Sequence, residues 1–135
     1  MSDYSVQEVM RCPVYTIQPA DSVAQAVRAM KAHGVSSLIV LPRFEGEAYG
    51  IITQHDIIAK VIAEGQNPMR VPVKEAMSRP VYAVAPDCSL RECASLMLLH
   101  RIRRLPVFAD GRPVGVLSRT TVFGALFNSS GELAA

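Results

Sequence analysis

The chain has 135 residues, of which half are hydrophobic and 19% are charged, and its formal net charge is +2. This composition excludes an intrinsically disordered protein, and the near-balanced charge argues against a nucleic-acid or anionic-membrane partner. The N-terminus lacks the pattern of a signal peptide, and no apolar run approaches the roughly 18 residues of a transmembrane helix. We therefore expect a cytoplasmic protein.

An internal repeat organises the chain. Twelve of the 36 aligned positions are identical when residues 6–41 are placed over residues 73–108, an offset of 67. A repeat is assigned before any fold, because it divides the chain into equivalent units. We expect one unit at residues 6–63, a linker at 64–72 and a second unit at 73–127.

The first unit predicts the element order β-α-β-β-α after a short opening helical turn. Its long helix should begin after the N-cap Ser22 and carry apolar residues at three-to-four spacing. It should end near Gly34, because glycine suits the left-handed position that follows a helix. The opening turn is expected at Val6–Met10, the strands at Val14–Ile17, Leu38–Leu41 and Gly50–Thr53, and the closing helix after Thr53.

The second unit predicts the same order of elements, with Arg101 in the place of Gly34. Ser89 and Ser118 are the expected N-caps, and Asp110-Gly111 is a signal for a tight hairpin turn. The opening turn is expected at Val73–Met77 and the strands at Val81–Val84, Leu105–Phe108 and Val114–Leu117.

A unit of roughly 60 residues has only a marginal core, so two such units gain stability by packing together. We expect an α+β fold, within the broad α/β class, in which two β-α-β-β-α repeats pack with pseudo-twofold symmetry. This packing would place equivalent strand ends opposite each other and leave two related clefts between the repeats. Small ligands commonly bind in clefts of this kind.

The three cysteines, Cys12, Cys88 and Cys93, do not have CxxC spacing. We expect neither a metal site nor a disulfide framework. Cys93 falls at an apolar helical position and is interpreted as a small buried hydrophobe. His55 has no histidine or cysteine partner at a spacing that suits metal ligation.

Five segments carry a resemblance to a known family: Val9–Ile17, Gly50–Asp56, Ala76–Val81, Ile102–Phe108 and Gly115–Ser118. In this order, and with the main motifs present twice, they resemble the cystathionine-β-synthase (CBS) domain family across residues 6–127. The resemblance implies a stand-alone pair of CBS domains whose role is binding and regulation, so we expect no enzyme activity. Members of the family commonly hold AMP, ADP, ATP, S-adenosylmethionine or related adenosyl compounds in the clefts between repeats.

Thr53 and Asp56 are the strongest candidates for a nucleotide site. From the residues alone, Thr53 caps the closing helix and Asp56 complements the helix dipole. The resemblance implies that Asp56 also accepts hydrogen bonds from a ribose diol, and that the Thr53 hydroxyl and the amides at this helix start suit a phosphate. Ser118 and Thr121 hold the equivalent positions in the second unit. Because threonine brings no charge, we expect a weaker second cleft there.

Arg103 and Arg104 stand where the first unit has Ser36 and Ser37. A charged pair at the start of a strand is ordinarily solvated, but the resemblance implies that Arg103 lies near Asp56 and pairs with a phosphate. Arg104 could instead point toward the other cleft or toward solvent. The predicted nucleotide site comprises Thr53, Asp56, Tyr82, Val84, Ile102, Arg103, Arg104 and Pro106. The predicted weaker cleft comprises Val35, Ser36, Ser118 and Thr121.

We expect a non-catalytic regulatory module that binds an adenosine-type nucleotide between its repeats and signals to a protein partner that the sequence does not identify. AMP, ADP or ATP is the expected ligand, with S-adenosylmethionine and NAD as alternatives. The apolar final helix at residues 121–127 favours a homodimer. The alternative function is a ligand-independent dimerisation or protein-interaction module. No nucleophile–base pair or Gly-rich phosphate loop supports an enzyme.

Overall fold

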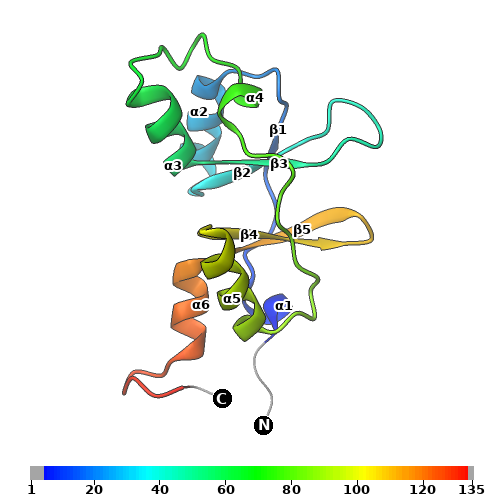
Figure 1. Ribbon diagram of the computed structural model, residues 1–135, viewed down its shortest axis with the longest axis vertical. Coiled ribbons are helices and arrows are strands. Elements are labelled where there is room, and N and C mark those ends of the chain that lie inside the picture. Colours follow the sequence, from blue (N-terminus) through cyan, green and yellow to red (C-terminus); the bar gives the residue numbers. More distant parts are fainter. Residues whose placement is uncertain (1–4, 134–135) are drawn as a thin grey trace. The chain divides into compact units, whose positions relative to one another are not determined.

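The computed structural model describes residues 5–133. They form two compact units, each of which contains a sheet and helices (Figure 1). The central unit comprises residues 15–81, and the terminal unit comprises the residues up to Val14 together with those from Tyr82 onward. Helices and strands are mixed in both units, which confirms the expected α+β class.

The central unit follows the predicted β-α-β-β-α order. Its elements are β1 (Thr16–Ile17), α2 (Val23–His33), β2 (Ser37–Val40), β3 (Gly50–Thr53), α3 (Gln54–Ile57), the π-helical η1 (Ile58–Ile62) and α4 (Val73–Ala76). The sheet has the order β1-β2-β3, in which β1 pairs with β2 in parallel and β2 pairs with β3 antiparallel. All of β2 and all of β3 except Thr53 are buried, so this sheet forms the middle of a core.

The terminal unit departs from the prediction at its first strand. Its elements are α1 (Val6–Val9), α5 (Leu90–His100), β4 (Arg104–Ala109), β5 (Arg112–Ser118) and α6 (Arg119–Leu126). Antiparallel β4 and β5 form its sheet. The strand expected at Val81–Val84 is reduced to one parallel bridge between Val84 and Val107.

A proline explains why this first strand is so short. In the central unit, the Ile39 amide donates to Tyr15 O at 3.0 Å and extends the pairing between β1 and β2. The residue equivalent to Ile39 in the second repeat is Pro106, which has no amide hydrogen to donate. The ladder therefore cannot extend back to Tyr82, and only the pairing around Val84 remains.

The two long helices begin and end as predicted. Ser22 Oγ accepts from the Gln25 amide at 3.1 Å, and Ser89 Oγ accepts from the Glu92 amide at 3.2 Å. The residue after each helix is left-handed, with φ of 64° at Gly34 and 54° at Arg101. The residues buried by these helices occupy equivalent positions in the two repeats: Val23, Ala26 and Met30 in α2, and Leu90, Cys93 and Met97 in α5.

Each opening helix packs into the unit that is built from the other repeat. In the terminal unit, the Val6 amide at the start of α1 donates to Cys88 O at 3.0 Å. In the central unit, the Val73 amide at the start of α4 donates to Asp21 O at 2.7 Å. The compact units therefore differ from the sequence repeats by an exchange of opening segments.

Glycines allow these exchanged segments to lie against the sheets. A Cβ atom at Gly115 would lie 2.4 Å from Met10 Sδ, and a Cβ atom at Gly50 would lie 3.0 Å from Ser78 O. Both distances are too short for a normal contact. The close approach of the opening segment thus explains why both copies of the Gly-x-x-Thr/Ser motif begin with glycine.

Candidate functional site

The start of α3 is fixed by reciprocal hydrogen bonds between Thr53 and Asp56. The Asp56 amide donates to Thr53 Oγ1 at 3.1 Å, and the Thr53 amide donates to Asp56 Oδ2 at 3.0 Å. This arrangement is a capping box, so the predicted structural roles of both residues are confirmed. Asp56 is only 8% exposed, which is unusual for a carboxylate.

Lys60 supplies a positive charge to this buried carboxylate. Its Nζ lies 3.5 Å from Asp56 Oδ1 and donates to Ala76 O at 3.0 Å. A separation of 3.5 Å is longer than a charge-assisted hydrogen bond, so Oδ1 retains capacity to accept from a hydroxyl group. Asp56 is thus a rigidly held anionic acceptor.

The equivalent helix start in the terminal unit has the same cap without the charge. Ser118 Oγ accepts from the Thr121 amide at 3.1 Å and lies 2.8 Å from Thr121 Oγ1. Because the Thr121 hydroxyl already bonds to Ser118, it offers less to a ligand than an aspartate would. This geometry agrees with the expectation of a weaker second position, which stays a prediction.

The residues that precede β2 and β4 lie beside these helix starts. Ser36 O accepts from the Gln54 amide at 3.0 Å, and Arg103 O accepts from the Arg119 amide at 3.0 Å. The structure therefore brings Ser36 together with the Thr53–Asp56 cap in the central unit. It brings Arg103 together with the Ser118–Thr121 cap in the terminal unit.

The arginines of the terminal unit form a basic cluster. Burial, followed by the charges of Arg103 and Arg119, lowers the pKa of Arg104, which shows that positive charges lie close together. Arg104 Nη1 donates to Arg103 O at 2.9 Å. Within residues 5–133, neither Arg103 nor Arg119 forms a salt bridge. An anion that binds here would relieve this repulsion.

The other predicted residues of the nucleotide site differ in exposure. Val84 and Pro106 are buried, and the Val84 amide donates to Pro106 O at 3.1 Å, so both belong to the terminal core. Ile102 is half-buried against that core, and in the other predicted cleft Val35 is half-buried against the central core. Tyr82, the one aromatic residue among the predicted residues, is 51% exposed.

Sequence reasoning missed a pair of stacked rings at the ends of α2 and α5. Tyr15 stacks on His33 and Tyr82 stacks on His100, with centroids 3.8 Å apart in both cases. His33 is the last residue of α2 and His100 is the last residue of α5. The repetition of both residue types at the same offset was the signal that would have identified the stacks.

Each predicted cleft combines residues of both units. Thr53 and Asp56 belong to the central unit, whereas the other six residues of the predicted nucleotide site belong to the terminal unit. The structure establishes the arrangement within each unit. The assembly of the two groups into one site remains a prediction.

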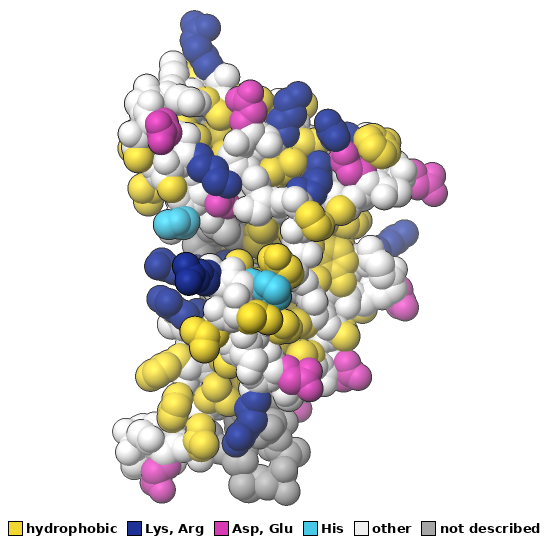
Figure 2. All heavy atoms as spheres, in the orientation of Figure 1, with side chains coloured by type: hydrophobic (Ala, Val, Ile, Leu, Met, Phe, Trp, Pro, Cys, Tyr) yellow, Lys and Arg dark blue, Asp and Glu magenta, His cyan; other side chains and the backbone are white. Residues whose placement is uncertain are grey.

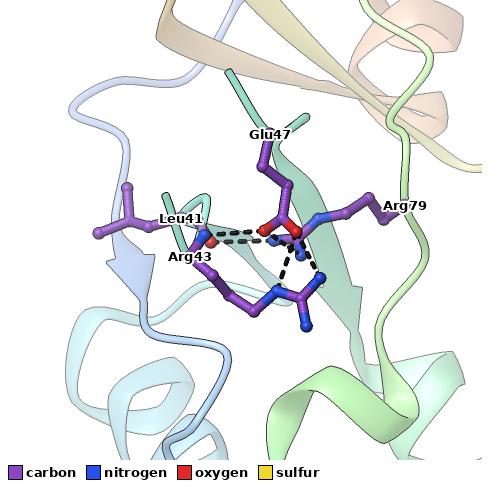
Figure 3. Close-up of polar contacts among 4 residues, drawn as sticks. All are labelled: Leu41, Arg43, Glu47 and Arg79. Atoms are coloured by element: carbon purple, nitrogen blue, oxygen red, sulfur yellow. Dashed lines mark hydrogen bonds and ion pairs between the residues drawn. The ribbon is translucent and has the colours of Figure 1, made fainter. Parts of the chain in front are cut away.

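A polar network that the sequence did not suggest holds the loop between β2 and β3 (Figure 3). Arg79 Nη1 donates to Glu47 Oε1 at 2.8 Å, and Arg79 Nη2 donates to Leu41 O at 2.9 Å. Arg43 Nε donates to Glu47 Oε2 at 2.8 Å. Hydrogen bonds from the Arg43 side chain and amide lower the pKa of Glu47 to about 2. The network ties this loop to the segment through which the chain leaves the central unit.

An apolar groove lies between α5 and α6, where Figure 2 shows hydrophobic side chains gathered on the surface. Its volume is about 480 Å³, and Arg101, Arg103 and Arg119 contribute basic groups to its lining. Leu98 is 82% exposed and Phe123 is 67% exposed. The sequence indicated the apolar character of α6 but not the contribution of α5.

Within residues 5–133, no cluster of histidine, cysteine, aspartate or glutamate side chains is arranged to hold a metal ion. No helix in the described part of the chain combines the length and apolar character needed to cross a membrane.

Comparison with known sequences identifies the family. The CBS domain family model matches residues 6–63 and 73–128. An uncharacterized protein of Methanopyrus kandleri is 35% identical over 119 residues, a match that covers 87% of this chain. The match covers 60% of the Methanopyrus protein, so this chain spans less than two thirds of that relative's length.

Two solved structures share the fold. A hexameric CBS-CP12 protein from bloom-forming cyanobacteria is 37% identical with a TM-score of 0.87, and the match covers 90% of this chain and 71% of that one. The CBS domain pair of protein MJ0100, in complex with 5-methylthioadenosine and S-adenosyl-L-methionine, is 25% identical with a TM-score of 0.77. That match covers 90% of this chain and 94% of the other. The resemblance inferred from the sequence is confirmed, and the chain belongs to the CBS domain family as a pair of CBS domains.

Proposed function

We propose that this CBS pair is a non-catalytic regulatory module that binds an adenosine-type nucleotide in the cleft predicted between its repeats. The observation that carries the proposal is the buried carboxylate of Asp56, which Thr53 holds in place and whose Oδ1 remains able to accept. Membership of the CBS family supports it, since the CBS pair of MJ0100 was solved in complex with adenosyl ligands.

The proposed role of Asp56 is to bind the ribose. A ribose presents two neighbouring hydroxyl groups as donors, and an ionised carboxylate is an acceptor that suits them. Burial strengthens such a bond because water competes less for the carboxylate. Thr121 provides only a neutral hydroxyl, so we propose one strong nucleotide site per chain. The weaker cleft would use Val35, Ser36, Ser118 and Thr121.

The proposed role of Arg103 is to bind the phosphate. Its side chain is exposed, and its neighbours Arg104 and Arg119 raise the local positive charge. A guanidinium can donate two parallel hydrogen bonds to phosphate oxygens. Arg104 would contribute mainly charge, because burial and its bond to Arg103 O restrain it. Tyr82, Val84, Ile102 and Pro106 would form the apolar side that receives the adenine.

AMP, ADP and ATP fit the proposed roles of Asp56 and Arg103, because each has both a ribose and a phosphate. S-adenosylmethionine and NAD share the adenosine group and are the alternatives. Signalling to a protein partner requires that the ligand bind one conformation of the module more tightly than another.

Calorimetric titration with AMP, ADP, ATP, S-adenosylmethionine and NAD tests the proposal. If a nucleotide binds, Asp56→Asn should weaken its affinity by about tenfold or more, since a hydrogen bond to a charged group is worth about 1.5–3 kcal/mol. Asparagine retains the size of the side chain and an oxygen that can accept from the Thr53 amide. The loss can therefore be assigned to the charge.

Thr121→Val is the matched control, because it removes the equivalent polar group of the other repeat. It should leave the affinity within about twofold. Equal losses of affinity in Asp56→Asn and Thr121→Val would show that the Asp56 carboxylate has no specific role in binding the ribose. Absence of heat and of thermal stabilisation with all five ligands would overturn nucleotide binding itself.

We also propose that the groove between α5 and α6 is covered by a second copy of the chain. The exposed Leu98 and Phe123 side chains support this homodimer, because monomers rarely expose apolar patches of this kind. The CBS-CP12 protein is hexameric, so a larger assembly is the other outcome that a mass measurement would detect. A ligand-independent dimerisation module is the second candidate function, and a stable dimer without nucleotide binding would favour it.

A further inference from the structure

Two cysteine side chains meet at the start of α5. The Sγ atoms of Cys88 and Cys93 are 3.7 Å apart, which is close to van der Waals contact. Cys93 is fully buried in the terminal core and Cys88 is half-buried beside it, whereas Cys12 is exposed. Four residues separate the two cysteines in the sequence, so their contact becomes evident only in the folded chain.

The local structure of the helix start explains this contact. Ser89 is the N-cap of α5, so Cys88 immediately precedes the cap and Cys93 follows it by four positions. Side chains at these two places commonly pack together in a hydrophobic staple. The equivalent residues of the first repeat are Asp21 and Ala26, so the thiol pair is confined to the second repeat.

We propose that Cys88 and Cys93 form a redox modification site, at which a low-molecular-weight disulfide converts the two thiols into a reversible intramolecular disulfide. The Cys88 thiolate attacks the reagent disulfide, which forms a mixed disulfide and releases one reagent thiolate. The Cys93 thiolate then attacks the Cys88 sulfur and expels the second reagent thiolate. The protein loses two electrons and two protons, and the reagent gains them as two thiols. This proposal is independent of nucleotide binding.

The two sulfur atoms are already close to bonding distance. A disulfide is about 2.05 Å long, so the two Sγ atoms must approach by roughly 1.7 Å from their separation of 3.7 Å. Cys88 reacts with the reagent disulfide first, because it is the more accessible of the two cysteines. Cys93 is then the resolving thiol, since it lies against Cys88 but is closed to a bulky reagent.

The electrostatic surroundings determine how fast this pair reacts. Burial raises the pKa of Cys88, and the carboxylates of Glu92 and Asp87 raise it further. Burial, with the hydrogen bond to Cys88, raises the pKa of Cys93 to about 12. Because the thiolate is the nucleophile, oxidation is slow at neutral pH and faster at alkaline pH. The raised pKa values also mean that the reduced form is not stabilised by a thiolate at neutral pH. In strongly oxidising proteins, by contrast, a low-pKa thiolate stabilises the reduced form.

The modification would act on the segment that receives α1. Cys88 O accepts from the Val6 amide at 3.0 Å, and Ser5 and Ser89 form an antiparallel bridge. A disulfide would tie this receiving segment to the first turn of α5. We expect slower hydrogen exchange of the Val6 amide in the oxidised protein than in the reduced protein.

The test equilibrates the full chain with mixtures of oxidised and reduced glutathione, followed by acid quench, alkylation and peptide mapping. In the expected product Cys88 is joined to Cys93, so this pair has two hydrogens fewer than the dithiol and takes up no alkyl group, whereas Cys12 is alkylated. Cys12→Ser should give the same product. Cys93→Ala, which introduces the residue of the first repeat, should stop at a mixed disulfide between glutathione and Cys88. Dithiothreitol should restore all thiols.

The same titration in urea measures how readily the two cysteines pair in the unfolded chain. The proposal requires the native chain to form the bond at a glutathione ratio no more oxidising than the unfolded chain needs. If the native thiols remain free where the unfolded chain is oxidised, the fold opposes the bond and the proposal is wrong. A disulfide through Cys12 as the only product would also overturn it. Should circular dichroism show that Cys93→Ala is unfolded, the wild-type titrations decide the question.

Discussion

Asp56 and Thr121 occupy the same position in two copies of one helix start. Each donates its amide to the N-cap hydroxyl at 3.1 Å, Asp56 to Thr53 and Thr121 to Ser118. Their side chains then differ. The Asp56 carboxylate accepts from the N-cap amide at 3.0 Å, whereas the Thr121 hydroxyl lies 2.8 Å from the N-cap hydroxyl. One repeat therefore places a buried charge where the other has a neutral group.

Thr121→Asp should convert the second helix start into a copy of the first. The new carboxylate would accept from the Ser118 amide and complete a capping box, next to the arginines at the start of β4 and α6. We expect the free energy of unfolding to rise by about 0.3–1 kcal/mol. If the proposed nucleotide site is correct, calorimetry should find two ligands per chain in this variant and one in the wild type.

Thr120→Asp is the matched control for this variant. It adds the same charge to the same helix turn at an exposed neighbouring position that lies outside the capping box. It should raise the stability to a similar extent through the helix dipole but leave the number of bound ligands unchanged. A stoichiometry of one in both variants would show that an aspartate at the cap is not sufficient for binding.

The Glu47 network predicts a specific loss of stability in acid. The arginine contacts lower the pKa of Glu47 from 4.5 to about 2. A group whose folded-state pKa is lowered stabilises the fold above its unfolded pKa and loses that effect as the pH falls through its folded pKa. Glu47→Gln should therefore have a lower melting temperature than the wild type at pH 7. The difference should persist down to about pH 4.5 and vanish toward pH 2.

Glu45→Gln serves as the control for this measurement, because Glu45 is exposed on the same loop and, within residues 5–133, forms no salt bridge with Arg79. Its melting temperature should follow the wild type throughout. A constant difference between Glu47→Gln and the wild type from pH 7 to pH 2 would show that packing, rather than charge, explains the role of Glu47.

Local signals were sufficient to predict most of the fold. Ser22 and Ser89 identified the starts of the long helices, Gly34 identified a helix end, and Asp110-Gly111 identified the turn between β4 and β5. The two central residues of that turn have φ of 53° and 75°, which is the geometry that a two-residue hairpin loop requires. These features depend on a few neighbouring residues, so a single sequence contains them.

The features that were not predicted depend on residues that are distant in the sequence. Pro106 in β4 shortens the first strand of the terminal unit, because proline has no amide hydrogen to donate to that strand. Arg79 and Glu47 are 32 residues apart, and the exchange of α1 and α4 follows from packing that has no local signature. Thr53 and Asp56 could be placed because their bonds are local, whereas the groups that would complete a nucleotide site come from another segment.

Gly115, which lies against the residues that follow α1, should be intolerant of substitution. In Gly115→Ala, the new Cβ atom would lie 2.4 Å from Met10 Sδ and 3.2 Å from Arg11 O. Because the backbone oxygen cannot move as easily as the methionine, we expect a loss of roughly 1–3 kcal/mol in the free energy of unfolding. Chemical denaturation followed by circular dichroism measures this loss.

Gly124→Ala is the matched control, since nothing lies within 4 Å of the new Cβ atom in α6. Alanine is a better helix former than glycine, so this variant should gain up to about 1 kcal/mol. Opposite signs for the two variants are expected. A stable Gly115→Ala protein would show that the packing of the opening segment does not depend on the close approach of Met10 and Arg11 to β5.

Phe123 should be critical for the proposed homodimer. Its ring is 67% exposed at the groove between α5 and α6, where a second copy of the chain would cover it. Burying one such side chain is worth about 1.5–3 kcal/mol, and a symmetric dimer buries two, so Phe123→Asp should weaken dimerisation by at least about 100-fold. Light scattering during size-exclusion chromatography should show a change from dimer to monomer.

Phe44→Asp is the appropriate comparison, because Phe44 is similarly exposed, at 62%, but lies on the loop between β2 and β3. It should leave the dimer intact. If both variants remain dimeric, the groove between α5 and α6 is not the interface. If both become monomeric, the loss reflects a general effect of an added negative charge. Only a selective effect of Phe123→Asp, with an unchanged circular dichroism spectrum, supports a second copy as the occupant of the groove, because the change then depends on the position of the aromatic ring.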